Sequence, residues 1–166
     1  MAEPQLQTHP IPPVYDENSR ILILGSFPSV KSREAKFFYG HPQNRFWKVT
    51  AAVFDEETPT TIAEKTAFLL RNHIAVWDVI ASCEIAGSSD SSIRNVIPND
   101  LSDILKSAQI RQIYVNGGTA AKYYQKYQFP TTKMQAVTLP STSPANAAWS
   151  IEKLTAAWHI IKNYAE

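Results

Sequence analysis

The chain has 166 residues, the size of one domain, and its composition of 44% hydrophobic and 19% charged residues is typical of a protein with a hydrophobic core. A formal net charge of +1 neither indicates nor excludes a nucleic-acid ligand, because domains that bind DNA by electrostatics alone are far more basic. The single cysteine, Cys83, excludes an intrachain disulfide and any zinc or iron–sulfur site built from cysteines alone.

The N-terminal segment differs in composition from the rest of the chain. Residues 1–18 contain four prolines among many polar residues, which predicts a poorly ordered, extended arm that crosses the surface of the domain. Residues 19–166 show no repeat, linker or low-complexity tract and are predicted to form a single domain. The first residues lack a basic stretch followed by an apolar run, so no secretory signal is visible. A cytoplasmic location is expected, associated with the nucleoid if the organism is a prokaryote.

Four short apolar runs have the β-branched composition and the Gly, Pro, Ser or Asn boundaries of buried strands. Segments with the helical spacing of apolar residues lie between them. The predicted strands are residues 21–24, 74–77, 110–115 and 134–139, and the predicted helices begin near residues 46, 61, 101, 119 and 150. This alternation predicts the α/β class and a three-layer α/β/α sandwich with a central four-stranded parallel sheet. Ligands of such sheets bind beyond the carboxyl ends of the strands.

Several helix starts carry capping residues. Thr61 and Glu64 have the spacing of a capping box. Either Asn99 or Asp100 is expected to cap the next helix, and Ser150 to cap the last one. The residues of the last helix that are predicted to face the core are Ile151, Leu154, Trp158 and Ile161.

The first strand is followed by the turn Gly-Ser-Phe-Pro-Ser, residues 25–29, and then by an aromatic segment, residues 37–47. A turn of this kind lets backbone N–H groups approach a ligand closely. Aromatic rings beside amides suit a pocket that stacks on a flat ring and reads its polar edge. A structural interpretation is equally open, in which Phe46 and Trp47 belong to the core and Asn44 is the N-cap of the following helix.

The other three strands also end in polar loops. Residues 78–94 are rich in small polar side chains, which either bind a base or phosphate or form surface turns. Asn116 offers a donor and an acceptor that fit a nucleobase edge, or it completes a turn. Residues 139–146 combine hydroxyl side chains with prolines, which suits contacts to DNA phosphates or a plain turn before the last helix.

Together the four loops resemble the uracil-DNA glycosylase superfamily. Residues 39–49, Tyr-Gly-His-Pro-Gln-Asn-Arg-Phe-Trp-Lys-Val, are similar over eleven consecutive positions to a segment of the mismatch-specific uracil-DNA glycosylases. Residues 25–29 and 139–146 occupy the places of the two signature motifs of those enzymes. By the order and spacing of elements, the resemblance covers roughly residues 19–164.

The departures from that pattern indicate a different branch. Phe27 stands where the mismatch-specific enzymes have the first-motif asparagine that serves the water. The sequence instead resembles the hypoxanthine-DNA glycosylases, also called DNA-deoxyinosine glycosylases, the sixth family, through residues 25–29, 40–47, 77–80 and 139–146. In that branch the catalytic asparagine belongs to the Gly-His-Pro-Gln-Asn segment, so the resemblance implies that Asn44 is catalytic. The cysteine count excludes the iron–sulfur families.

The resemblance also implies roles for the other loop residues. The backbone N–H groups of Ser26 and Phe27 are expected to bind a base carbonyl, and Tyr39 to stack on the flipped base. Asn116 occupies the place of the base-reading asparagine. Ala145 aligns with a leucine that acts as a wedge in relatives, which leaves open which residue fills the gap in the DNA. The residues expected to contact DNA are Ser29, Ser141, Thr142, Ser143, Ala145 and Asn146.

The expected activity is hydrolysis of the N-glycosidic bond of deoxyinosine in DNA, which releases hypoxanthine and leaves an abasic site for base excision repair. The expected partner is DNA with a deaminated base, the enzyme is expected to be a monomer, and no cofactor, metal cluster or membrane is expected. Two alternatives stay open: a uracil- or mismatch-specific glycosylase of the same fold, and a damaged-DNA-binding domain without catalysis. Phe27 favours the binding domain, whereas Asn44 and Asn116 favour an enzyme.

Overall fold

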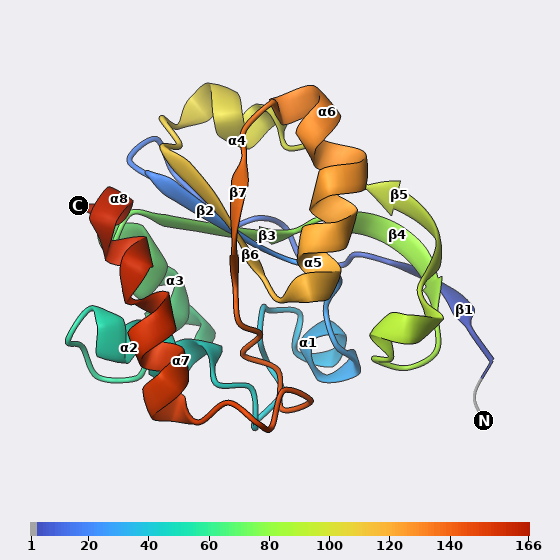
Figure 1. The fold of residues 1–166 in the computed structure, drawn as a ribbon, viewed down its shortest axis with the longest axis horizontal. Helices are drawn as coiled ribbons and strands as arrows, with labels where there is room; N and C mark the ends of the chain where they lie inside the picture. The colour runs from blue at the N-terminus through green and yellow to red at the C-terminus, as the bar shows by residue number, and fades with distance from the viewer. Residues whose placement is uncertain (1–2) are drawn as a thin grey trace.

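The computed structural model describes residues 3–166; Met1 and Ala2, which begin the predicted arm, lie outside the described residues. At its centre lies a four-stranded parallel sheet in the order β3-β2-β6-β7 (Figure 1). The strands are β2 (Ile21–Gly25), β3 (Ile74–Asp78), β6 (Gln112–Asn116) and β7 (Ala136–Leu139). The predicted parallel sheet is confirmed, and the strand ends differ from the predicted ones by one or two residues.

Helices cover both faces of this sheet, as Figure 1 shows. One layer consists of α2 (Phe46–Val53), α3 (Ile62–Arg71), α7 (Ile151–Trp158), the 3-10 turn η3 (His159–Ile161) and α8 (Lys162–Ala165). The other consists of α4 (Ser102–Ser107), α5 (Gly118–Tyr123), the π turn η2 (Tyr124–Gln128) and α6 (Phe129–Thr132). A short helix, α1 (Val30–Ala35), follows β2. The three-layer α/β/α prediction is confirmed.

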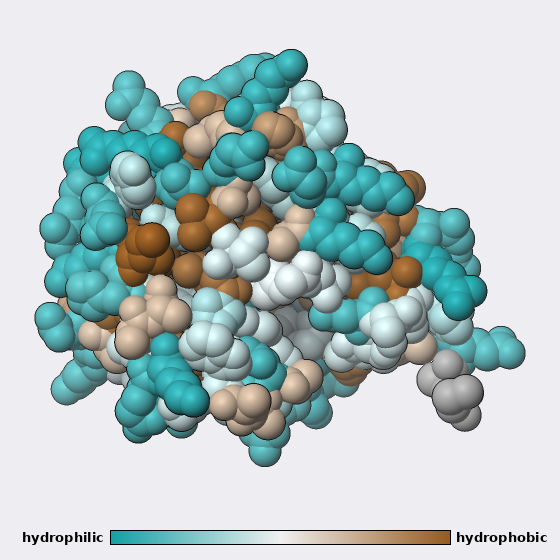
Figure 2. Space-filling model, in the orientation of Figure 1, coloured by the Kyte–Doolittle hydropathy of each residue, from teal (hydrophilic) through white to brown (hydrophobic). Residues whose placement is uncertain are grey.

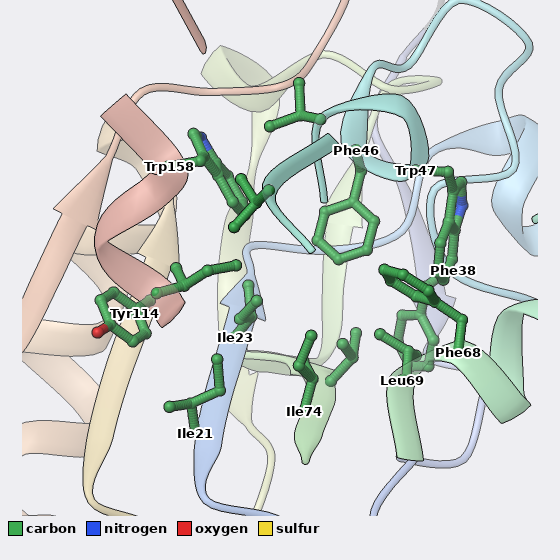
Figure 3. Packing of buried hydrophobic residues seen from close by; sticks show 14 of the residues in the cluster. Ile21, Ile23, Phe38, Phe46, Trp47, Phe68, Leu69, Ile74, Tyr114 and Trp158 are labelled. Carbon is green, nitrogen blue, oxygen red and sulfur yellow. The ribbon is translucent and has the colours of Figure 1, made fainter. Parts of the chain in front are cut away.

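The core is divided by the sheet because successive residues of a strand face opposite sides. Ile21 and Ile23 of β2 pack toward α2 and α7, whereas Leu22 and Leu24 belong to the cluster on the other face. Figure 3 shows the first cluster, in which the fully buried Phe46 and Trp158 lie over these strands. Each large apolar side chain buried in this way contributes about 1.5–3 kcal/mol, so the strand ends that carry the polar loops are held firmly.

A second, antiparallel sheet lies beside the first in the order β1-β4-β5. Its strands are β1 (Gln5–Thr8), β4 (Ile80–Ile85) and β5 (Arg94–Pro98), and the 3-10 turn η1 (Asp90–Ser92) precedes β5. The prediction of one loop over residues 78–94 is therefore wrong. Ile80, Cys83 and Ile85 are buried, but two register shifts in the pairing of β4 break the strict alternation that would have indicated a strand.

The N-terminal segment is held against the domain, although its composition had suggested poor order. Residues 5–8 form β1 and pair with residues 82–85 of β4. Val14 forms an isolated bridge with Val76 of β3 and is buried. The segment thus passes beside the carboxyl end of β3, where the candidate site lies.

The predicted caps are largely confirmed. The hydroxyl of Thr61 accepts from the Glu64 N–H at 3.0 Å, and the Glu64 carboxylate accepts from the Thr61 N–H at 3.0 Å. Ser150 caps α7 by accepting from a backbone N–H of the first turn. At α4, Asp100 rather than Asn99 binds the N–H of the first helical residue.

One prediction for the last helix is wrong. Leu154, Trp158 and Ile161 are buried as predicted, but Ile151 is 38% exposed. Ile151 is the first residue of α7 and lies outside the cluster that buries the other three.

No helix within residues 3–166 is long and apolar enough to cross a membrane.

Candidate functional site

A cavity of about 380 Å³ opens at the carboxyl ends of the parallel strands. Figure 2 shows this face hollowed below the middle of the molecule, with residues of intermediate hydropathy around the hollow. Ten of the eleven predicted site residues line the cavity: Ser26, Phe27, Ser29, Tyr39, Asn44, Asn116, Ser141, Thr142, Ser143 and Ala145. The eleventh, Asn146, lines an adjacent open hollow together with Ser141, Ser143 and Ala145. Its volume places the cavity among small-molecule sites, which span about 300–1,000 Å³.

Asn44 both binds the start of α2 and lines the cavity, which are the two interpretations that the sequence left open. Its Oδ1 accepts a hydrogen bond of 2.9 Å from the backbone N–H of Phe46, the first residue of α2. The side chain is nevertheless half-buried and lines the cavity, and its Nδ2 donates to no acceptor within residues 3–166. Because an amide oxygen has two lone pairs, Oδ1 can also accept from a water. The bond to Phe46 therefore orients the amide without removing it from the site.

Tyr39 lies between the core and the cavity. Its ring stacks on Phe46, with centroids 4.0 Å apart and 16° between the planes, so only its other face is left for a ligand. The hydroxyl is buried and has no hydrogen-bond partner among residues 3–166. Burial, and then the nearby Asp78 carboxylate, raise the pKa of Tyr39 far above its ordinary value. The Asn116 amide lies near the hydroxyl, without a hydrogen bond to it, and lowers this pKa. The net pKa is still raised, so the phenol stays protonated.

Phe27 forms part of the cavity wall and is 9% exposed. The Arg33 guanidinium lies 5.5 Å from the centroid of its ring. The backbone N–H groups of Ser26 and Phe27 donate to no acceptor among the described residues. Two free amides beside a cavity can bind a carbonyl oxygen, which is the arrangement predicted for this turn.

Asn116 is occupied more fully than predicted. Its Nδ2 donates to the hydroxyl of Thr142 at 3.0 Å, and its Oδ1 accepts from the Thr142 N–H at 3.1 Å. The amide thereby ties the end of β6 to the loop after β7. One N–H and one lone pair remain for a ligand.

The loop after β7 is held in shape by its own hydrogen bonds. The hydroxyl of Ser141 accepts from the Ser143 N–H, the hydroxyl of Ser143 accepts from the Ala145 N–H, and Asn146 donates to the Ser141 carbonyl. Ser29 plays a similar part at α1, where its hydroxyl accepts from the N–H of Ser32. These turns present small polar groups at the rim of the cavity in fixed positions.

Three residues of the site were not predicted from the sequence. Arg45 donates to the backbone carbonyls of residues 143, 146 and 149, so it clamps the loop after β7. His9 and Asp78 form a buried pair, with His9 Nε2 2.7 Å from Asp78 Oδ2, and Asp78 lines the cavity. Asp78 could have been noticed as an acidic residue at the end of a buried strand, but nothing local marks His9 or Arg45. Within residues 3–166, no group of three or more His, Cys, Asp or Glu side chains could hold a metal ion.

Comparison with known proteins agrees with this geometry. The model of the uracil DNA glycosylase superfamily matches residues 12–163. A hypoxanthine DNA glycosylase of Methanosarcina acetivorans is 36% identical over 141 residues, which cover 84% of this chain and 88% of the relative. A protein of the same name from Methanosarcina barkeri is 35% identical over 115 residues, 68% of this chain and 72% of the relative.

A solved structure is similar as well. The solution NMR structure of a candidate uracil DNA glycosylase from Methanosarcina acetivorans superimposes with a TM-score of 0.81 at 31% identity, covering 95% of this chain and 97% of the other. Family model, relatives and structure all span most of the chain, and the resemblance read from the sequence is confirmed. The chain belongs to the uracil DNA glycosylase superfamily.

Proposed function

We propose that the protein is a monofunctional DNA glycosylase that releases hypoxanthine from deoxyinosine in DNA. The observation that carries the proposal is that the Asn44 amide lines an open cavity at the rim of the sheet. The names of the two Methanosarcina relatives support hypoxanthine as the base. The product is an abasic site, which base excision repair then processes.

The cavity suits a nucleotide turned out of the DNA stack. The base enters between Phe27 and the free face of Tyr39, and the Ser26 and Phe27 amides bind a carbonyl oxygen of the base. As the glycosidic bond lengthens, negative charge accumulates on the base, and these N–H groups stabilise it. A sugar with oxocarbenium character is left behind.

Asn44 then positions the water that captures this sugar. The water oxygen bonds to C1′, and the proton that it releases neutralises the departed base anion. An amide accepts a hydrogen bond from water but is too weak a base to deprotonate it, which suits attack late in the departure of the base. Because the bond from the Phe46 N–H fixes the amide, little reorganisation is needed. Phe27 cannot take over this role, since its side chain has no acceptor.

DNA is held at the rim. Ser29, Ser141 and Ser143 present hydroxyls there, with Thr142, Ala145 and Asn146 completing the surface. Such groups grip phosphates and set the register of the DNA without reading sequence. We further propose a cytoplasmic location, associated with the nucleoid if the organism is a prokaryote, and a monomeric state, which sedimentation tests.

The test is single-turnover release of hypoxanthine, uracil and xanthine from otherwise identical oligonucleotides. We expect hypoxanthine to be released fastest, and Asn44→Ala to lower the rate at least about 100-fold. Gln43→Ala changes an exposed neighbour of Asn44 and serves as the control. Adding Phe27→Asn to Asn44→Ala should not restore activity; a rescue would contradict the assignment of the water to Asn44.

A uracil-specific enzyme is the second candidate, favoured by the description of the similar NMR structure. Faster release of uracil than of hypoxanthine would establish it. Tight binding to abasic or inosine-containing DNA with no base release would instead indicate a binding domain without catalysis.

A further inference from the structure

The floor of the cavity holds a buried carboxylate that the proposed mechanism does not use. Asp78 is the last residue of β3, and its side chain is 5% exposed and lines the cavity. Its Oδ2 lies 2.7 Å from His9 Nε2, and the His9 side chain is 3% exposed. A buried charge is retained only when hydrogen bonds compensate its loss of water, so it matters which residue of this pair donates the hydrogen bond.

The neighbours of His9 determine its tautomer. Its Nδ1 accepts a hydrogen bond of 3.2 Å from the backbone N–H of Ile11, so Nδ1 carries no proton. The proton of the neutral imidazole is therefore on Nε2, which donates it to Asp78. Phe27 and Phe38 surround the ring, with centroids 5.9 and 6.0 Å away. Asp78 is accordingly a carboxylate with one oxygen bound and held in place.

The other oxygen of Asp78 faces the cavity. Oδ1 accepts no hydrogen bond within residues 3–166 and is not sealed from the cavity. It lies over Gly25, where an added Cβ would come within 2.4 Å of it. That same Cβ would be 3.2 Å from the Tyr39 hydroxyl, which also lacks a partner. Asn116 is tied at both ends to Thr142, and Asp90, the other carboxylate that lines the cavity, is exposed on η1. Asp78 Oδ1 is therefore the buried carboxylate oxygen that is left for a ligand here.

Deamination gives the hydrogen-bonding edge of a base a donor that a carboxylate oxygen can accept from. In adenine, N1 is an acceptor beside an amino group; in hypoxanthine, N1 carries a hydrogen beside a carbonyl. A carboxylate is acceptor-only, so it attracts the N1–H of hypoxanthine and repels the N1 lone pair of adenine. The Ser26 and Phe27 amides supply the complementary donors for the carbonyl.

We propose that Asp78 determines base specificity by accepting the lactam N–H of the deaminated base, and that His9 is its positioning residue. The inference rests on the proposed glycosylase function and adds the group that distinguishes hypoxanthine from adenine, the base from which it forms by deamination. Uracil and xanthine, which also have a lactam N–H, satisfy the same contact.

The first test uses the wild-type protein and a modified substrate. Methylation of N1 of hypoxanthine removes the hydrogen that Asp78 would accept. We expect release of N1-methylhypoxanthine to be at least about 100-fold slower than release of hypoxanthine, since sites built around a hydrogen bond reject analogues that lack it. Equal rates for the two bases would overturn the proposal, whereas failure to release hypoxanthine at all would overturn the proposed function itself.

The second test changes the carboxylate. In Asp78→Asn, His9 Nε2–H still requires an acceptor, so it binds the amide oxygen and turns the NH₂ group into the cavity as a donor. We expect hypoxanthine release to fall at least about 100-fold while binding to abasic-site DNA, which has no base, changes less than threefold. Asp103→Asn makes the same change on the exposed surface of α4 and is the control. Hypoxanthine release within threefold of wild type in Asp78→Asn would refute the assignment.

A third test removes the Asp78 carboxylate altogether. In Asp78→Ala the contact is absent for both substrates, so hypoxanthine and N1-methylhypoxanthine should be released at rates within tenfold of each other. His9→Gln keeps an N–H donor, so it should preserve discrimination between the two bases better than His9→Leu. An undiminished methyl penalty in Asp78→Ala, or equal discrimination by the two His9 variants, would contradict the respective role.

Discussion

Replacing Arg45 by Met tests whether the loop after β7 depends on one guanidinium. Arg45 donates to the carbonyls of Ser143, Asn146 and Trp149, and the variant leaves all three without their charged donor. Removing a hydrogen bond to a charged group costs about 1.5–3 kcal/mol, but water reaches these half-buried carbonyls. We therefore expect a total loss of about 2–4 kcal/mol, less than three full bonds.

Urea denaturation and DNA binding measure the effect of this variant. A loss of that size lowers the melting temperature by about 2–4 °C per kcal/mol in a chain of this length. Binding to abasic-site DNA should weaken as well, because the clamped loop lines the rim of the cavity. Lys48→Met removes the same charge from the exposed side of α2 and is the control. If Arg45→Met and Lys48→Met unfold within about 0.5 kcal/mol of each other, the clamp contributes nothing and the reasoning is refuted.

Three further predictions concern stability and reactivity. Gly25→Ala places a Cβ 2.4 Å from Asp78 Oδ1 and should cost about 1–3 kcal/mol in urea unfolding; an unchanged value would mean that the carboxylate can move aside. Hydrogen bonds from Thr61 and its neighbour lower the pKa of the exposed Glu64 to about 2, so its stabilisation is complete above its ordinary value of 4.5 and is lost as pH falls through about 2. The difference in unfolding free energy between wild type and Glu64→Gln should shrink over that interval, and a constant difference would argue against the cap. Burial raises the pKa of Cys83 to about 11, so iodoacetamide should alkylate it only after unfolding, and rapid labelling of the native protein would contradict its burial.

The central sheet could be predicted because its signals are local. Residues such as Ile21 and Ile74 lie in short β-branched runs, and each run is one strand. The antiparallel sheet could not be predicted in the same way. The pairing of β1 with β4 joins segments far apart in the chain, and the register shifts in β4 hide its alternation.

The same distinction applies to the site. The loops that line the cavity could be found because parallel strands bring their carboxyl ends together, which makes the loops after them neighbours. The resemblance to the glycosylase family then indicated single residues within those loops. Which polar groups are free could not be predicted. The sequence left open whether the Asn116 amide is free for a base or completes a turn, and in the structure it is tied to Thr142. It also left open whether the stretch that begins at Asp78 binds a ligand or forms surface turns, and Asp78 is buried against His9. These differences depend on contacts across the fold, which a single sequence does not reveal.

The pairing of His9 with Asp78 also bears on how the molecule folds. The two residues are 69 positions apart, so the chain must close a long loop before they meet. Until the N-terminal strand docks, the acceptor at the cavity floor is not oriented. A chain whose N-terminal strand is undocked is therefore unable to tell hypoxanthine from adenine by this contact.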